Sequence, residues 1–322
     1  MSNISQDAAV SAGTPAAEED YFTHVEGVGD IPRDLYKYVE SSPMGDLPRY
    51  SVHIVIQHLL VVVTFLILAA TGLPIYFSDQ FWAPHVIFVF GGADTARLIH
   101  RIAAFTMIFA SAYHVVTIIG GTFRKIINRE FDYKRTMIPR FKDLVDLYQD
   151  IKYFLRLTPY RPKMEKFMYK QKMHYFAILW GNTVLITAGT ALLFPDLMAH
   201  LFPDTLGKLI THTVETGGSF PALFQDLARL MHADEAVMAL IVVALWHWSN
   251  VHLVPGRFPL QWAFLTGKIT REHQIEEHFL EYLNNLREIP EEREYIKNLL
   301  NITDSATKKQ TTISISDLSR IH

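Results

Sequence analysis

The sequence predicts an all-α integral membrane protein built as a four-helix bundle, with further amphipathic helices on the cytoplasmic side. Three observations favour this class. Hydrophobic residues make up 49% of the 322 residues, and they gather in stretches near the roughly 20 residues that a helix needs to cross a bilayer. Polar segments separate these stretches. Basic residues are concentrated in only one of the connections between them.

The composition excludes several classes of protein. The chain contains no cysteine, so it forms no disulfide, cysteine-ligated zinc site, iron–sulfur cluster or covalent haem attachment. Its formal net charge of -3 provides no basic surface, so nucleic acid is not an expected partner. The expected surroundings are membrane lipid and other proteins.

The spans define the expected organisation. Four stretches are predicted to form membrane helices: about Ile54–Tyr76, Leu98–Gly120, His174–Phe194 and His232–Val254. They divide the chain into three parts: a cytoplasmic N-terminal tail (1–48), a membrane domain (49–259) and a cytoplasmic C-terminal tail (260–322). A multi-pass protein of the bacterial cytoplasmic (inner) membrane is the expected result.

The orientation follows from the basic residues. The connection over 122–172 carries fourteen Lys and Arg against six acidic residues, whereas the connections over 77–96 and 195–231 together carry two. Because basic connections stay on the cytoplasmic side, we expect 122–172 and both termini to lie in the cytoplasm. The other two connections then face outward.

The two tails differ in pattern. The first 20 residues are rich in Ser, Ala, Thr and acidic residues and are expected to be disordered. Residues 270–301 combine many charges with scattered Leu, Ile and Tyr. This pattern is typical of amphipathic helices, which would lie against the membrane or a partner subunit, or form a solvated helical tail.

Histidines inside the predicted spans are the main functional signal, because polar groups are costly in a bilayer. In the second span, His100 and His114 are fourteen residues apart, about 21 Å along the axis and within about 40° of whole helical turns. In the fourth span, His232 and His247 are fifteen apart, about 22 Å and about 60° out of register. Since both spans run inward, His100 is expected level with His232, and His114 with His247.

Two imidazoles facing each other across a flat macrocycle fill both axial positions of a haem iron, which favours electron transfer over ligand binding. Two such pairs predict two non-covalent b-type haems with bis-His ligation. Arg97 and Arg101 lie where the propionates of the outer haem would emerge.

The first span contains a second candidate for the histidine that binds the inner haem together with His247. His58 is expected at the same depth as His114 and His247, so either His58 or His114 could complete the inner pair. His252, together with His114, could instead hold a third haem. The remaining histidines outside the spans have no expected role: His24, His85, His200, His212, His273, His278 and His322.

The ordered set of motifs over about 49–278 resembles a known family. The matching pieces are Arg49…His58, Thr71-Gly72-Leu73-Pro74, Arg97-Leu98-Ile99-His100-Arg101, Gln171-Lys172, Met231-His232 with Glu235-Ala236, His247…His252, and Phe258-Pro259…Thr266-Gly267-Lys268-Ile269. The chain resembles the di-haem cytochrome b family of formate dehydrogenase gamma subunits and nickel–iron hydrogenase cytochrome b subunits. It is most similar to cytochrome b subunits of bacterial quinone-linked complexes with multihaem cytochromes c.

The resemblance implies ligands for each haem. The outer haem would be held by His100 and His232, and the inner haem by His58 and His247, which ranks His58 above His114. The formate dehydrogenase subunit has no histidine at the place of His114. However, pairs on only two helices are similar to the cytochrome b of quinol-oxidising cytochrome bc complexes, so both candidates stand.

The resemblance also implies a quinone site beside the inner haem, near the start of the third span. Only Gln171 matches the family there, because Met168 and Lys170 replace its Asn and Gly. The residues themselves suggest a site near His53, His58, Gln171 and His174, whose polar groups could bind the oxygens of menaquinone or ubiquinone and lead protons to the cytoplasm.

The expected function is an electron-transfer subunit of a quinone-linked oxidoreductase. Electrons would pass between the quinone pool and a redox subunit at the outer face, either a multihaem cytochrome c or an iron–sulfur or dehydrogenase subunit, in either direction. Two alternatives come from other classes. One is a haem-binding membrane anchor or sensor, and the other is a transporter that uses the histidines as a proton relay.

Overall fold

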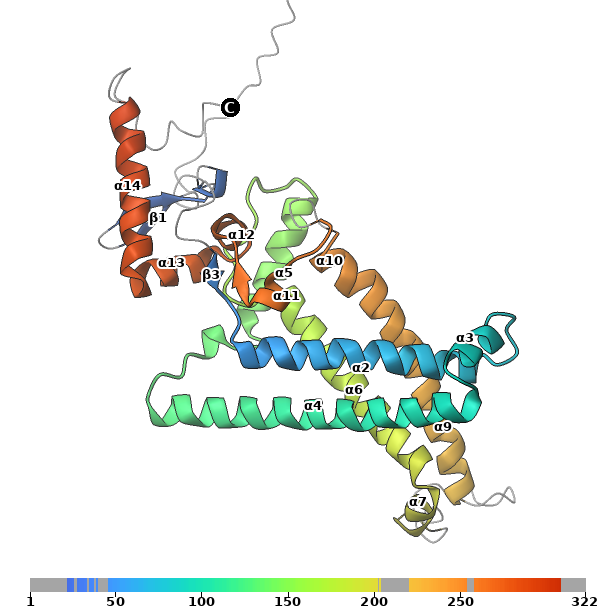
Figure 1. Ribbon diagram of the computed structural model, residues 1–322. Coiled ribbons are helices and arrows are strands. Elements are labelled where there is room, and N and C mark those ends of the chain that lie inside the picture. The colour runs from blue at the N-terminus through green and yellow to red at the C-terminus, as the bar shows by residue number, and fades with distance from the viewer. Residues whose placement is uncertain are drawn as a thin grey trace, which may run out of the picture. The chain divides into compact units, whose positions relative to one another are not determined.

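The structure is a computed structural model that describes residues 22–25, 28–33, 35–37, 39, 46–201, 203, 220–253 and 258–307. The described residues are mostly helical (Figure 1). They belong to two compact units. One unit combines segments from 1–47, 134–169 and 269–322, and the other combines 48–133 with 170–268. The expected disordered tail over 1–20 lies outside the described residues, as do 202 and 204–219 of the connection expected over 195–231.

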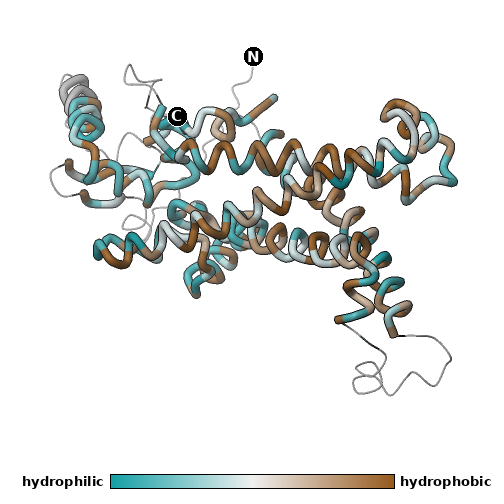
Figure 2. Tube along the Cα trace, turned by 60° about the horizontal axis from the view of Figure 1, so that its bottom comes forward, coloured by the Kyte–Doolittle hydropathy of each residue, from teal (hydrophilic) through white to brown (hydrophobic). Residues whose placement is uncertain are grey.

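The second unit contains three helices that are long and apolar enough to cross a membrane: α2 (Val52–Tyr76), α4 (Ala93–Ile127) and α6 (Tyr169–Leu193). Hydrophobic residues predominate along these helices (Figure 2). Leu66 of α2 and Phe109 of α4 are 58% and 66% exposed, which water would penalise and lipid would not. The first three expected spans are therefore confirmed as candidate membrane helices, and they indicate a membrane protein.

The fourth expected span falls on three consecutive helical segments: α9 (Phe220–Ile241), the π-helical η4 (Val242–Trp248) and α10 (Ser249–Val251). This helical run begins twelve residues before His232, and the predicted end at Val254 lies outside the described residues. It is not among the helices that are apolar enough to span, because charged residues interrupt α9: Asp226, Arg229, Asp234 and Glu235. A fourth span therefore remains a prediction.

Helices α2 and α4 pack side by side along a seam with a seven-residue period (Figure 1). On α2 the seam consists of buried polar residues: Gln57, Thr64 and Thr71. On α4 it contains buried alanines: Ala96, Ala103 and Ala110. A seven-residue period keeps one face of each helix against its partner, and small residues allow close approach. The seam holds His100 and His114 of α4 beside α2.

The outward connection expected over 77–96 is largely helical. It contains α3 (Ala83–Val89) and the first turn of α4, and α7 (Pro195–Leu201) follows α6 after the third span. Helix α4 has 35 residues and is therefore about 52 Å long, more than a bilayer core requires. It extends beyond the predicted 98–120 at both ends, since Asp94 in its first turn and Lys125 in its last turn suit the helix dipole.

The first unit is built from segments that are far apart in the chain. Strands β1 (Phe22–Val25) and β2 (Gly29–Pro32) form an antiparallel hairpin in which Phe22 pairs with Pro32 and Val25 with Gly29. The helical elements of this unit are η1 (Leu35–Lys37), α5 (Phe141–Phe154), α12 (Arg271–Glu277), α13 (Phe279–Glu288) and α14 (Pro290–Thr307). Shorter elements lie where the chain passes between the units: β3 (Leu47–Pro48), η2 (Tyr133–Arg135), α11 (Ala263–Thr266) and β4 (Lys268–Ile269).

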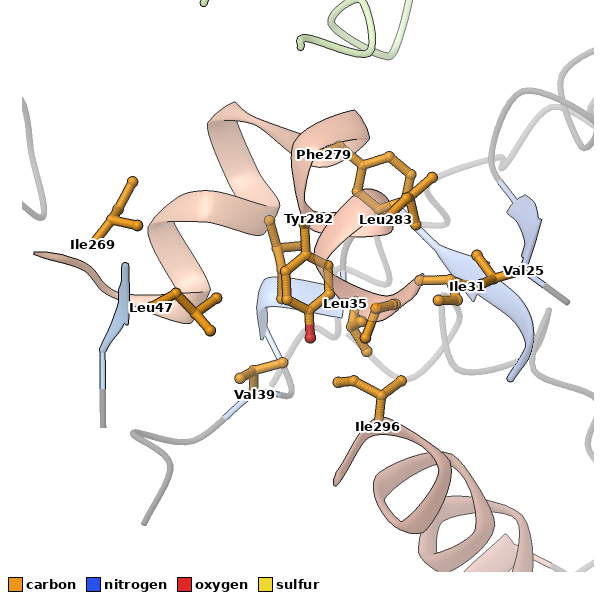
Figure 3. Close-up of a cluster of buried hydrophobic side chains, with 12 residues drawn as sticks. Val25, Ile31, Leu35, Val39, Leu47, Ile269, Phe279, Tyr282, Leu283 and Ile296 are labelled. Atoms are coloured by element: carbon orange, nitrogen blue, oxygen red, sulfur yellow. The ribbon is translucent and has the colours of Figure 1, made fainter. Parts of the chain in front are cut away.

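The apolar faces of the C-terminal helices are covered by the N-terminal segment. Tyr282, Leu286 and Ile296 are fully buried in one cluster with Ile31 and Leu35 (Figure 3). These faces were expected to lie against the membrane or a partner subunit, or in solvent. In the structure, described residues of the N-terminal segment supply apolar surface to α12, α13 and α14: Val25, Ile31, Leu35, Val39 and Leu47.

A buried ion pair crosses this core. Arg271 of α12 donates from its Nη2 to Oε2 of Glu292 at 2.6 Å and from its Nε to the other carboxylate oxygen. Tyr282 of α13 donates to the same carboxylate at 2.8 Å. Burial, and then the negative charge of Glu292, raises the pKa of Tyr282 well above its ordinary value, so the phenol keeps the proton that it donates. The three groups join α12, α13 and α14.

Removing one partner of this pair should destabilise the unit strongly. Glu292→Ala leaves Arg271 charged and buried without its carboxylate, which is expected to cost about 3–5 kcal/mol of unfolding free energy. Glu291→Ala, one residue earlier on the exposed face, is the matched control. Limited proteolysis of the full-length protein should cleave the first unit faster in the Glu292 variant only. Equal cleavage of both variants would contradict the prediction.

Candidate functional site

Two clusters of histidine rings lie at opposite ends of the helices of the second unit. The first pairs His100 of α4 with His232 of α9, whose ring centroids are 6.3 Å apart and whose planes are inclined by 72°. Sequence spacing placed these two residues at the same depth, and the structure brings them together. Both rings are half-buried.

Hydrogen bonds hold both rings of the His100–His232 pair in one tautomer. Nδ1 of His232 donates to the carbonyl of Leu185 at 3.0 Å. Nδ1 of His100 lies 2.9 Å from the hydroxyl of Thr71, which itself donates to the carbonyl of Ile67 at 2.7 Å and therefore accepts from the ring. With Nδ1 protonated, each ring keeps its lone pair on Nε2, the arrangement that metal-bound histidines use.

Each ring of the His100–His232 pair packs against a glycine of a neighbouring helix. A β-carbon at Gly72 of α2 would lie 3.0 Å from Cε1 of His100, and one at Gly189 of α6 would lie 3.0 Å from Cε1 of His232. Carbon atoms in ordinary contact are farther apart. Two glycines on two helices therefore make room for the two imidazoles.

The second cluster surrounds His247 on the π-helical segment η4. The ring of His58 on α2 lies 6.3 Å from it with planes inclined by 46°. The ring of His174 on α6 stacks on it at 4.8 Å and 11°. Nδ1 of His58 is buried and has no hydrogen-bond partner among the described residues, which marks it as a nitrogen with an unused bonding position. Nearby, Nδ1 of His252 accepts from the backbone of Gln261 at 3.0 Å.

His114 is part of a different network. Its Nδ1 donates to Oε1 of Gln57 at 2.9 Å, and its Nε2 lies 3.0 Å from the hydroxyl of Tyr175, which donates to it. The amide of Gln57 in turn donates to Thr117 at 2.9 Å, which fixes the direction of the chain of bonds. Both nitrogens of His114 are therefore used within the protein.

The other predicted site residues are arranged as follows. Arg97 pairs with Asp94 at 3.1 Å, and Arg101 is exposed one residue after His100. His53 bonds through Nδ1 to the hydroxyl of Tyr113 at 2.9 Å rather than joining the cluster around His247. Gln171 lies half-buried, one turn before His174 on α6. Of the four residues expected near a quinone, the structure joins His58 and His174 through His247.

Several supporting residues escaped prediction. In the sequence, Thr71 and Gly72 were only part of a motif, and Gly181 and Gly189 were only a hint of the broken helices that a proton-relay transporter would have. A β-carbon at Gly181 would overlap Oε1 of Glu235, so this glycine admits a carboxylate between α6 and α9. The available signal was a glycine in an apolar span, which usually marks a close approach of another group.

No model of a known protein family matches this chain, and no curated protein shows significant sequence similarity to it.

Proposed function

We propose that this protein is a di-haem cytochrome b subunit of the bacterial inner membrane, which passes electrons between a quinone pool at the cytoplasmic side and a redox subunit at the outer face. The observation that carries the proposal is that two pairs of histidine rings have the same distance between their centroids. His100 with His232, and His58 with His247, each have ring centroids 6.3 Å apart. The two pairs lie toward opposite ends of α2 and α4.

This spacing suits a metal between the rings. An imidazole nitrogen binds a transition metal at about 2.0 Å, so two rings on opposite sides of one iron have centroids about 6.2 Å apart. A direct hydrogen bond or van der Waals stack would bring the rings closer, as for His174 and His247 at 4.8 Å. The tautomers of His100 and His232 fit the same interpretation, because Nε2 of each ring keeps its lone pair.

At the outer end, His100 and His232 would hold the first haem. Thr71 and the carbonyl of Leu185 orient the rings, and Gly72 and Gly189 leave room for them. Arg97 and Arg101, near the start of α4, would neutralise the propionates.

At the inner end, we assign the second haem to His58 and His247. His114 is the weaker candidate because Gln57 and Tyr175 occupy both of its nitrogens. His174 lies too close to His247 for an iron between them. A haem iron with two histidine ligands exchanges single electrons and has no open position for a gas or substrate.

The remaining polar groups at the inner end would serve the quinone. His174 and Gln171 lie on one helix about one turn apart, and His53 begins α2. A quinone carbonyl needs a hydrogen-bond donor, and its reduction takes up protons. We expect these groups to bind menaquinone or ubiquinone and to exchange protons with the cytoplasm.

The test is the haem content of the full-length protein purified from membranes in mild detergent. We expect two b-type haems per chain in a pyridine haemochrome assay, reducible by dithionite and unchanged by carbon monoxide. A folded preparation without haem would overturn the proposal in favour of a proton relay. Carbon monoxide binding to the reduced protein would favour a sensor with an open axial position.

A further inference from the structure

A second group of metal-ligating side chains lies in the first unit, whereas the histidines of the proposed haem sites belong to the second unit. His273, Glu277 and His278 each offer one ligand atom, and these atoms all lie within 4.8 Å of one another. His273 and Glu277 are one turn apart on α12, with Nε2 and Oε2 separated by 4.0 Å. His278 is the residue between α12 and α13, outside helical geometry.

The burial of this group separates it from an ordinary surface ion pair. The side chains of His273 and Glu277 are 15% and 13% exposed, and His278 is 1% exposed. A carboxylate with so little water around it is stabilised by positive charge. Arg161 supplies such a charge to Glu277. Burial opposes its ionisation, but Asp150 and then Glu277 raise the pKa of Arg161, and its guanidinium is held by Asp150 at 2.9 and 3.2 Å.

His278 is oriented as a metal ligand. Its Nδ1 donates to the carbonyl of Glu165 at 2.9 Å, which leaves the lone pair on Nε2. A second hydrogen bond joins the same two segments: the backbone N–H of Leu280 donates to the carbonyl of Met164 at 3.0 Å. Metal-bound histidines regularly give their other N–H to a backbone carbonyl in this way.

We propose that His273, Glu277 and His278 form a zinc site that joins α12 to α13. Two imidazoles and one carboxylate are a common zinc ligand set, with water completing the tetrahedron, whereas calcium and magnesium prefer oxygen ligands alone. Ligand atoms around tetrahedral zinc lie about 3.4 Å apart, so the group contracts by roughly an ångström when it binds the ion. The site strengthens a junction in the core of the first unit.

The experiment measures zinc bound by the tag-free, full-length protein in detergent after chelator treatment, using equilibrium dialysis and elemental analysis. We expect one zinc per chain, with affinity lowered at least tenfold by His273→Ala and by Glu277→Gln. His24→Ala, in the same unit and 73% exposed, should bind zinc as the wild type does. Equal binding by the wild type and both site variants would overturn the proposal.

A second measurement tests the location independently of stoichiometry. Zinc should slow hydrogen exchange of the backbone amides at the junction of α12 and α13 in the wild type and in His24→Ala. It should have no such effect in His273→Ala. The comparison requires that the first unit be folded in each variant. Hydrogen exchange of the backbone amides of α14, measured without zinc, is the check of folding. Zinc-dependent protection that persists in His273→Ala would contradict the site.

Discussion

Replacing His58 by alanine should remove one of the two proposed haems, whereas replacing His114 by alanine should leave both. The reason is the state of the ring nitrogens. His58 has a buried Nδ1 without a partner among the described residues and lies 6.3 Å from His247. His114 already bonds to Gln57 and Tyr175. The measurement is haem per chain with the reduced-minus-oxidised spectrum of each variant.

Two further variants complete this experiment. His247→Ala should match His58→Ala, with one haem remaining per chain. His85→Ala is the matched control, because His85 is exposed on the short helix α3 and bonds only locally to the carbonyl of Phe81. Loss of a haem in His114→Ala with retention in His58→Ala would reverse the assignment of the inner ligand.

Valine at Gly72 or Gly189 should empty the proposed outer haem site and leave the proposed inner one filled. A β-carbon at either position would lie 3.0 Å from a ring carbon of His100 or His232, and the branched side chain adds two more atoms in the same space. The rings cannot shift freely, since Thr71 and Leu185 hold them. We expect haem content to fall from two toward one per chain.

The control for these variants is Gly120→Val on α4, where a β-carbon would meet no atom within 4 Å. Gly120→Val changes the helix propensity in the same way but places no side chain against a histidine ring. The two glycines act on one site from two different helices, so both variants should show the same spectrum. Full haem content in both Gly72→Val and Gly189→Val would show that these glycines do not shape the outer site.

The expected spans and the observed helices agree because hydropathy is a local property of the chain. Helix α2 begins two residues before the predicted Ile54, and α6 begins five residues before the predicted His174. Helix α4 exceeds its prediction at both ends because polar turns outside a bilayer can continue a helix. The fourth predicted span differs, because charged residues interrupt α9 and a π-helical segment, η4, follows it.

The register of His247 could not be obtained from counting residues. The expected depth and facing of His247 hold for a continuous α-helix from His232, but the i→i+5 bonds of η4 underwind the helix before His247. The rotation about the helix axis between His232 and His247 therefore differs from the roughly 60° expected for a continuous α-helix. Seven-residue spacing of Gln57, Thr64 and Thr71 was visible in the sequence and is the signal that could have predicted the seam with α4.

By itself, the sequence determined that the chain has long apolar helices, and it assigned His100 and His232 to a common depth. Those properties depend on residues within one helix, or on the direction in which each helix runs. Only the tertiary structure decided that His247 meets His58 and His174, and that the N-terminal segment covers the C-terminal helices. Both results depend on contacts between segments far apart in the chain, which local periodicity does not encode.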